Sequence, residues 1–328
     1  MSLSTVRARV GSTLLDFVRD QWSQMGVFMF GSRRDTWAQD PEALLLFSLE
    51  IGRDDARFFD ELLDWLRTNG DLVSGRRLAA LAKHDPALPI VEASVEWAAA
   101  HGSPLRLGSG IVAASAEPVA LLRHEGLPGR HDEIFLSHGL LKPPTVPSGK
   151  SSAPDLDLPI NLAFWLRRHF GVNARAEIVR FLLTSGVPDA RALAISAAAA
   201  STKRNVSDAL AHLAAAGDVR RTWVGNEARY AINRERWMTV LGLEEDRIPG
   251  HRDWPQLLHA LVEIRRFVFQ PELDEMTDYQ RASVARELMH RLAPALLHAG
   301  VPVSDRRTGA DFWATFVENV DAALARIE

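Results

Sequence analysis

The sequence predicts a mainly α-helical fold that contains one clear β-hairpin. Apolar residues recur three and four positions apart along most of the 328 residues, and this spacing places them on one face of an α-helix. Two short stretches typical of β-strands flank Gly225-Asn226, a residue pair that favours a tight turn. A run rich in Pro, Ser and Gly lies near the middle of the chain, and it predicts a break between two folded regions.

The N-terminal part is expected to form a helical domain. Asp40 fits the N-cap of a helix, and the proline that follows it suits the first helical position. A second amphipathic helix ends at Asn69-Gly70, which is a C-terminal signal. From residue 103 to 138, glycines and prolines interrupt the apolar pattern, so mainly loops are predicted there.

The proline-rich run is expected to form an extended linker or a connector that lies along the surface. Helices are again predicted after residue 250, where Thr277 and Gln280 have the spacing of a capping box. Pro294 is expected to kink or end the helix that they begin. The predicted organisation is an N-terminal helical domain (1–141), a linker (142–159), a central domain (160–240) and a C-terminal helical region (250–328).

The central domain contains, in order, a helix, a short alanine-rich helix, a basic helix and the hairpin. Asp189 fits the cap of the short helix, and Ser201 fits the N-cap of the basic helix. Gly217 suits the left-handed residue that ends the basic helix. Two strands, 219–224 and 228–232, follow. The apolar face of the basic helix is formed by Val206, Ala209, Leu210 and Leu213.

The opposite side of the basic helix carries polar residues that can reach base edges or phosphates. Arg204 and Asp208 lie opposite the apolar face, and Asn205 and Ser207 flank them. Between residues 174 and 236 there are ten Lys and Arg against six Asp and Glu, a net charge of +4 in a chain of net charge −4. A basic segment inside an otherwise acidic protein is typical of a DNA-binding domain joined to other parts.

Residues 174–236 resemble the winged-helix domains of bacterial transcription regulators of the MarR and ArsR kind. The segments that carry the resemblance are RAEIVRFLLTSG, STKRNVSDALAHLAAAGDV and ARYAIN. The resemblance implies that the third helix lies in the major groove and that the hairpin, or wing, contacts the backbone or the minor groove. The predicted DNA-binding residues are Thr202, Lys203, Arg204, Asn205, Ser207 and Asp208 of the helix and Arg220, Arg221 and Arg229 of the wing.

The function predicted from these observations is sequence-specific binding of double-stranded DNA by a bacterial, cytoplasmic transcription regulator. A homodimer that binds two half-sites is expected, because one such module buries little surface. The loop region or the C-terminal helices are expected to bind an effector, either a small molecule or a protein. The alternative is a winged-helix protein-interaction subunit, antitoxin-like or defence-associated, without specific DNA binding.

Neither an enzyme nor a cofactor is predicted. The chain has no cysteine, which excludes disulfides and thiol catalysis, and it has no P-loop, GxSxG or GxGxxG motif. Asp35 and Asp40 lack the alternate spacing that a nucleotidyltransferase metal pair requires. A membrane span and a signal peptide are not expected either. A polar loop matches no metal-site spacing, so no metal is predicted at His124, Glu125, His131, Asp132, Glu133 and His138.

Overall fold

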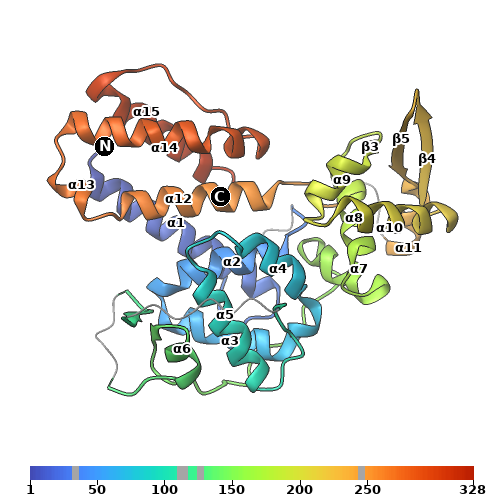
Figure 1. Cartoon of the computed structure of the whole chain (residues 1–328), viewed down its shortest axis with the longest axis horizontal. Coiled ribbons are helices and arrows are strands. Elements are labelled where there is room, and N and C mark those ends of the chain that lie inside the picture. The colour runs from blue at the N-terminus through green and yellow to red at the C-terminus, as the bar shows by residue number, and fades with distance from the viewer. Residues whose placement is uncertain (32–36, 109–116, 124–128, 243–247) are drawn as a thin grey trace.

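The computed structural model describes residues 1–31, 37–108, 117–123, 129–242 and 248–328. In these residues the protein is mainly α-helical with a small antiparallel sheet, as the sequence predicts. Figure 1 shows two groups of elements. We call α1–α6 with α12–α15 the helical body, and we call α7–α11 with β3–β5 the hairpin unit.

The helical body combines elements from both ends of the chain around one apolar core. Phe17, near the N-terminus, stacks on Trp254 of the C-terminal region with ring centroids 5.8 Å apart. Its helices are α1 (Leu3–Gln24), α2 (Pro41–Ile51), α3 (Ala56–Asn69), α4 (Gly75–Ala82), α5 (Leu88–Ala100), α6 (Glu133–Ser137), α12 (Trp254–Val268), α13 (Glu272–Glu275), α14 (Asp278–His298) and α15 (Phe312–Leu324), with 3-10 turns at Gly52–Asp54, Gly70–Leu72 and Gly309–Asp311.

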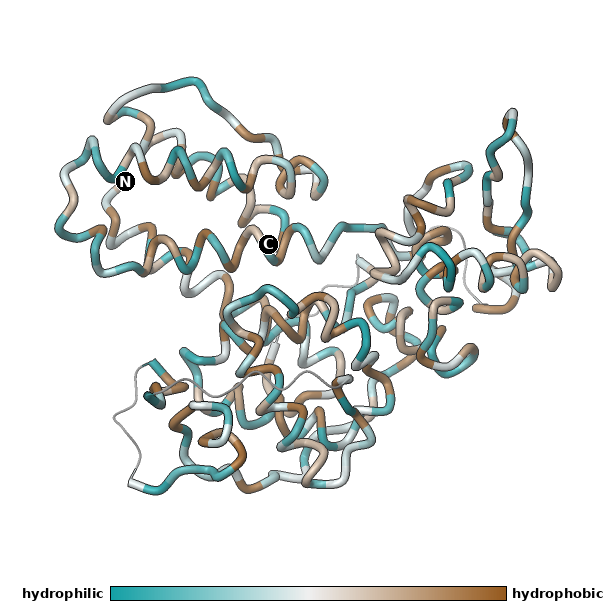
Figure 2. Tube along the Cα trace, in the orientation of Figure 1, coloured by the Kyte–Doolittle hydropathy of each residue, from teal (hydrophilic) through white to brown (hydrophobic). Residues whose placement is uncertain are grey.

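The sequence-based prediction lists residues 1–141 and 250–328 as separate regions. In the structure, buried side chains of both regions belong to the same core. Polar and apolar residues are interspersed along these helices in Figure 2. Helix α2 lies deepest, since all of its residues except Leu46 are buried. None of the described helices has both the length and the apolar character that a membrane span needs.

The proline-rich run lies along α3. The Nζ atom of Lys142 is 2.7 Å from a carboxylate oxygen of Asp60, and the backbone N–H groups of Gly149 and Ser151 donate to Asp64. Just before the run, β2 (Leu140–Leu141) pairs in parallel with β1 (Val119–Ala120). The run is therefore a connector fixed to the surface of the helical body.

The hairpin unit has its own, smaller apolar core. Strand β5 is central in its sheet, with β3 on one side and β4 on the other, both antiparallel. The hairpin turns at Gly225-Asn226, as the sequence predicts. Its elements are α7 (Leu162–Phe170), preceded by a 3-10 turn at Pro159–Asn161, α8 (Ala174–Thr184), β3 (Ala190–Arg191), α9 (Ala192–Ala198), α10 (Lys203–Ala215), β4 (Val219–Val224), β5 (Glu227–Ile232) and α11 (Arg234–Leu241).

Three sequence-based assignments are corrected. Thr202, not Ser201, caps α10: its side chain accepts the N–H of Asn205, whereas Ser201 precedes the cap and donates its backbone N–H to the carbonyl of Ser196 in α9. Asp189 does not cap α9, because its carboxylate pairs with Arg229. Helix α14 continues to His298 through Pro294, since a proline removes one backbone N–H while buried neighbours such as Leu296 keep the last turns packed on the core.

The turn between α9 and α10 contains the one non-glycine residue of the described chain with a positive φ, Ala200 at +44°. This left-handed conformation costs an L-residue about 1–2 kcal/mol, because Cβ approaches the following carbonyl oxygen. The turn sets the angle between α9 and α10. Packing of the hairpin unit must therefore compensate the strain at Ala200.

We expect Ala200→Gly to raise the free energy of unfolding by up to about 1 kcal/mol. Relief of the left-handed strain exceeds the roughly 0.4–1 kcal/mol by which glycine adds entropy to the unfolded chain. Urea unfolding followed by circular dichroism measures the change. Ala194→Gly, at an exposed position of α9, is the matched control and should be destabilised by about 1 kcal/mol; equal losses in both variants would contradict the strain.

Candidate nucleic-acid interface

Helix α10 buries one face and exposes the other. Val206, Ala209, Leu210 and Leu213 are buried, as the sequence predicts. The remaining positions in its first two turns, including Lys203 and Arg204, are exposed. The polar side chains are therefore free to meet a partner.

The exposed face of α10 is divided in two. At 100° per residue, Lys203 and Ser207 lie toward one edge of this face, and Arg204 lies near its middle, about 40° from Asp208. The side chains of Asn205 and Asp208 lie on the other side, where they line a cavity of about 630 Å³ between α10 and the helical body. The residues predicted as one DNA-contacting set thus face two different environments.

Cross-strand pairing fixes the orientation of the wing arginines. Arg220 and Arg229 lie on the same face of the hairpin, away from Val219 and Tyr230, because Arg220 pairs with Ala231 and Thr222 pairs with Arg229. The side chain of Arg221 lies on the opposite face. Its guanidinium is 4.6 Å from the centre of the Trp223 ring, a cation–π contact.

Arg229 differs from the other predicted contacts because its charge is compensated within the protein. Its guanidinium lies 3.3 Å from Asp189 and 3.5 Å from Glu227, and 23% of its side chain is exposed. It connects the hairpin to the segment before β3. Among the predicted set, Arg229 is thus held as a structural ion pair.

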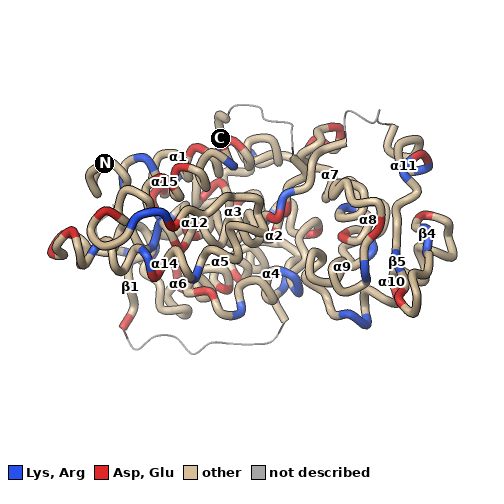
Figure 3. The backbone as a smooth tube through the Cα atoms, turned by 90° about the horizontal axis from the view of Figure 1, so that it is seen from above, with Lys and Arg blue, Asp and Glu red and all other residues tan. Residues whose placement is uncertain are grey.

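Four cations of the predicted set have no ion-pair partner within the described residues: Lys203, Arg204, Arg220 and Arg221. Figure 3 shows Lys and Arg interspersed with Asp and Glu along the whole trace. In the hairpin unit, these four cations lie on two elements that contact each other, α10 and β4.

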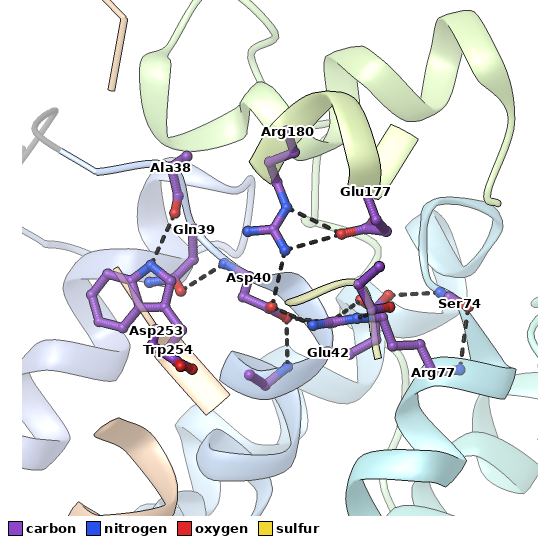
Figure 4. A network of polar contacts seen from close by, with 12 residues as sticks. Ala38, Gln39, Asp40, Glu42, Ser74, Arg77, Glu177, Arg180, Asp253 and Trp254 are labelled. Atoms are coloured by element: carbon purple, nitrogen blue, oxygen red, sulfur yellow. Dashed lines mark hydrogen bonds and ion pairs between the residues drawn. The ribbon is translucent and has the colours of Figure 1, made fainter. Parts of the chain in front are cut away.

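A buried network of charges lies where the hairpin unit meets the helical body (Figure 4). Asp40 caps α2 by accepting the N–H of Ala43 at 3.1 Å, which confirms the predicted cap, and both of its oxygens accept from Arg77 of α4. Arg180 of α8 reaches the same carboxylate at 3.2 Å. Asp40 therefore links α2, α4 and α8.

Glu42 and Glu177 extend this network. Arg167 of α7 contacts Glu42 at 2.7 Å and Glu177 at 2.6 Å. Glu177 also lies 3.0 Å from Arg180. Three carboxylates and three guanidiniums thus neutralise one another, and all six side chains are at most 7% exposed.

The buried acids stay ionised because guanidiniums surround them. Burial raises the pKa of Glu177, but attraction to Arg167, Arg180 and Arg77 outweighs it and lowers the pKa to about 2. Burial likewise raises the pKa of Asp40, and Arg77 and Arg180 hold it well below its ordinary range. Both carboxylates carry full charge at neutral pH.

The network also supports the turn that precedes α10. The Nε atom of Arg77 donates to the backbone carbonyl of Ala199 at 3.3 Å. The same guanidinium binds Asp40 and Glu42. A residue of the helical body therefore contacts the α9–α10 turn directly and helps to fix where α10 begins.

No pattern in the sequence predicts this network. The available signal was weak: Glu177 and Arg180 are three residues apart on one helix, which is also the spacing of a solvated ion pair. The partners Asp40, Glu42 and Arg77 lie about a hundred or more positions away in the chain. Only the tertiary structure brings them together.

The described residues of the polar loop considered as a metal site do not converge on one point. Asp132 caps α6 by accepting backbone N–H groups, and His138 contacts Glu96 at 2.8 Å. His124, Glu125 and Asp35 lie outside the described residues. Within the described residues, no group of three or more His, Asp or Glu side chains is arranged to hold a metal ion.

No protein-family model, curated protein or solved structure matches this chain.

We expect Glu177→Gln to lower the free energy of unfolding by about 3–5 kcal/mol at pH 7, because it leaves buried guanidiniums uncompensated. Since the folded pKa of Glu177 is depressed, its contribution is complete above pH 4.5 and is lost as the pH falls toward about 2. As the pH falls from 4.5 to about 2, Glu177→Gln should therefore lose less free energy of unfolding than the wild type does. Chemical unfolding at several pH values tests this, with the exposed Glu235→Gln as control; equal stability of the two variants would contradict it.

His251 provides a second, separate pH dependence. Burial, followed by repulsion from Arg180, lowers its pKa to about 4, so the folded protein holds the ring neutral against Phe181. The unfolded chain binds a proton near pH 6.5, so stability falls as the pH drops from 6.5 to 4, by at most about 1.4 kcal/mol per pH unit.

We expect His251→Gln to flatten the stability profile between pH 6.5 and 4. Urea midpoints measured at half-unit pH steps give the slope for the variant and the wild type. His290→Gln, at an exposed position of α14, is the control. A slope that is identical in wild type and His251→Gln would show that His251 does not cause the pH dependence.

Proposed function

We propose that this protein is a winged-helix transcription regulator that binds double-stranded DNA sequence-specifically. In this proposal α10 enters the major groove and the hairpin β4–β5 contacts the DNA backbone. The observation that carries it is the set of exposed, uncompensated cations on α10 and β4, two elements that adjoin in the structure.

The order of elements supports the proposal. Helix α8 is followed by β3, α9, a tight turn, α10 and the hairpin β4–β5, with β3 paired to β5. A helix packed on two others and a hairpin beside it is the arrangement with which winged helices present their third helix to DNA. Buried Ile195 and Val206 join α9 and α10 to the same core.

The individual residues have different roles in this proposal. Lys203, Arg204 and Ser207 lie on the open side of α10, where an arginine can bind guanine with two hydrogen bonds and a serine can bind several bases. Arg220 and Arg221 supply phosphate contacts from the wing. Thr202 caps the helix. Asn205 and Asp208 line the cavity, so they can contact bases only if DNA approaches the side of α10 that faces the cavity.

A single module buries too little surface for tight and specific binding, so the proposal includes a homodimer that binds two half-sites. The exposed side of the helical body is the part available for subunit contacts. The spacing of half-sites in a selected DNA sequence would report the distance between the two α10 helices.

We expect Arg204→Ala to weaken specific DNA binding by about 1–3 kcal/mol, roughly 5- to 150-fold, because a two-bond contact to guanine is lost. Arg57→Ala is the matched control: Arg57, like Arg204, is exposed, has no ion-pair partner among the residues that the structure describes, and is second in its helix. Arg229→Ala should change thermal stability more than affinity, because its charge is already compensated.

The measurement is selection of bound fragments from sheared genomic DNA at physiological salt, followed by titration of the enriched sequence. Enrichment of one motif by the wild type, and its loss in Arg204→Ala alone, would support the proposal. Equal binding by wild type and both arginine variants, only at low salt, would contradict specific recognition, because non-specific affinity depends steeply on salt.

One observation favours a second candidate function, a protein-interaction module. Trp223 and Val224, beside the hairpin turn, are each 60% exposed, and apolar side chains of this size at a protruding tip suit a protein partner. A docking module would enrich no DNA motif in the selection. Its partner binding would be lost in Trp223→Ala and retained in Arg204→Ala.

A further inference from the structure

We propose that the cavity between α10 and the helical body binds a small phosphorylated organic molecule. The cavity measures about 630 Å³, within the roughly 300–1,000 Å³ of small-molecule sites. Three elements form its walls: α4 of the helical body, and α8 and α10 of the hairpin unit. In Figure 1, α4 is the helix of the body that lies next to the hairpin unit.

The charge of the cavity favours an anion. Two of its charged residues, Arg77 and Glu177, are compensated within the buried network. The guanidiniums of Arg76 and Arg175 are exposed and have no ion-pair partner within the described residues. Because they come from two different helices, they can approach a bound anion from two sides.

Phosphate fits these two arginines better than a carboxylate does. A phosphate monoester carries a charge of about −1.5 to −2 at neutral pH, which matches two guanidiniums, whereas a carboxylate carries −1. The planar guanidinium also binds phosphate oxygens through two parallel hydrogen bonds. The amide group of Asn205 lines the same cavity and adds a further donor.

The ligand must also contain hydrogen-bond donors. Asp208 lines the cavity from α10, and within the described residues it has no ion-pair partner. Its carboxylate repels phosphate but accepts hydrogen bonds from hydroxyl or amino groups. The cavity is also much larger than one phosphate ion. A sugar phosphate or a nucleotide satisfies the charge, the donors and the volume.

Such a ligand would contact the helix that we propose to bind DNA. Asn205 and Asp208 belong to the predicted DNA-binding residues, and they also line the cavity. If the proposed function holds, ligand and DNA compete for these side chains, and each lowers the affinity of the other by the same factor. This consequence rests on the proposed function, whereas binding of the ligand itself does not.

The test is isothermal titration of the full chain with ribose 5-phosphate, and separately with inorganic phosphate, in the absence of DNA. We expect one saturable site for ribose 5-phosphate. Affinity should fall about tenfold or more in Arg76→Ala and in Arg175→Ala, since each removes a charged hydrogen-bond donor. The control variant Arg57→Ala should bind as the wild type does, because Arg57 is an exposed residue of α3, far from the cavity lining.

Thermal unfolding of each variant without ligand checks its fold, and a rise in the unfolding temperature with ribose 5-phosphate provides a second measure of binding. Three results would overturn the proposal: no binding to the wild type, equal weakening in Arg57→Ala, or inorganic phosphate binding as tightly as ribose 5-phosphate. A loss of DNA affinity in Arg76→Ala without any ligand binding would assign the cavity to a DNA phosphate instead. Because the titrations contain no DNA, they can succeed or fail independently of the DNA selection.

Discussion

The buried ion-pair network of Asp40, Glu42, Arg77, Arg167, Glu177 and Arg180 is the constraint on which the arrangement of the protein depends. A charge removed from water is tolerated only when opposite charges and hydrogen bonds compensate it. These six charges come from both the helical body and the hairpin unit. Separating the two units would leave charges uncompensated on both sides, so the network fixes their relative position more than it adds net stability.

The same network determines where α10 lies. Glu177 and Arg180 hold α8, and α8 packs against α10. Arg77 contacts the α9–α10 turn from the opposite direction through the carbonyl of Ala199. The turn includes Ala200 in a left-handed conformation, a strained geometry that persists only where its surroundings enforce it. The exposed cations of α10 are thereby presented from a rigid base, which specific recognition of a partner requires.

The features that the sequence could predict are those set by neighbouring residues. The apolar face of α10 follows from helical spacing, the hairpin from Gly225-Asn226, and the start of α2 from the cap at Asp40. The features that it could not predict involve distant residues. Arg229 appears in the sequence as a free wing cation, yet it pairs with Asp189, 40 positions away. The shared core of the two chain ends likewise depends on contacts between segments that no local pattern connects.

The position of the cavity limits how a bound ligand can act. A ligand shifts a conformational equilibrium only by its difference in affinity for the two states. Here the walls of the cavity belong to two units that the network holds together, so opening them would cost the compensation of buried charges. A large rotation of the hairpin unit is therefore unfavourable. A ligand bound there would instead act locally, because it would contact Asn205 and Asp208 on α10 and leave Lys203 and Arg204 exposed. Under the proposed function it would alter specificity more than the electrostatic part of DNA affinity.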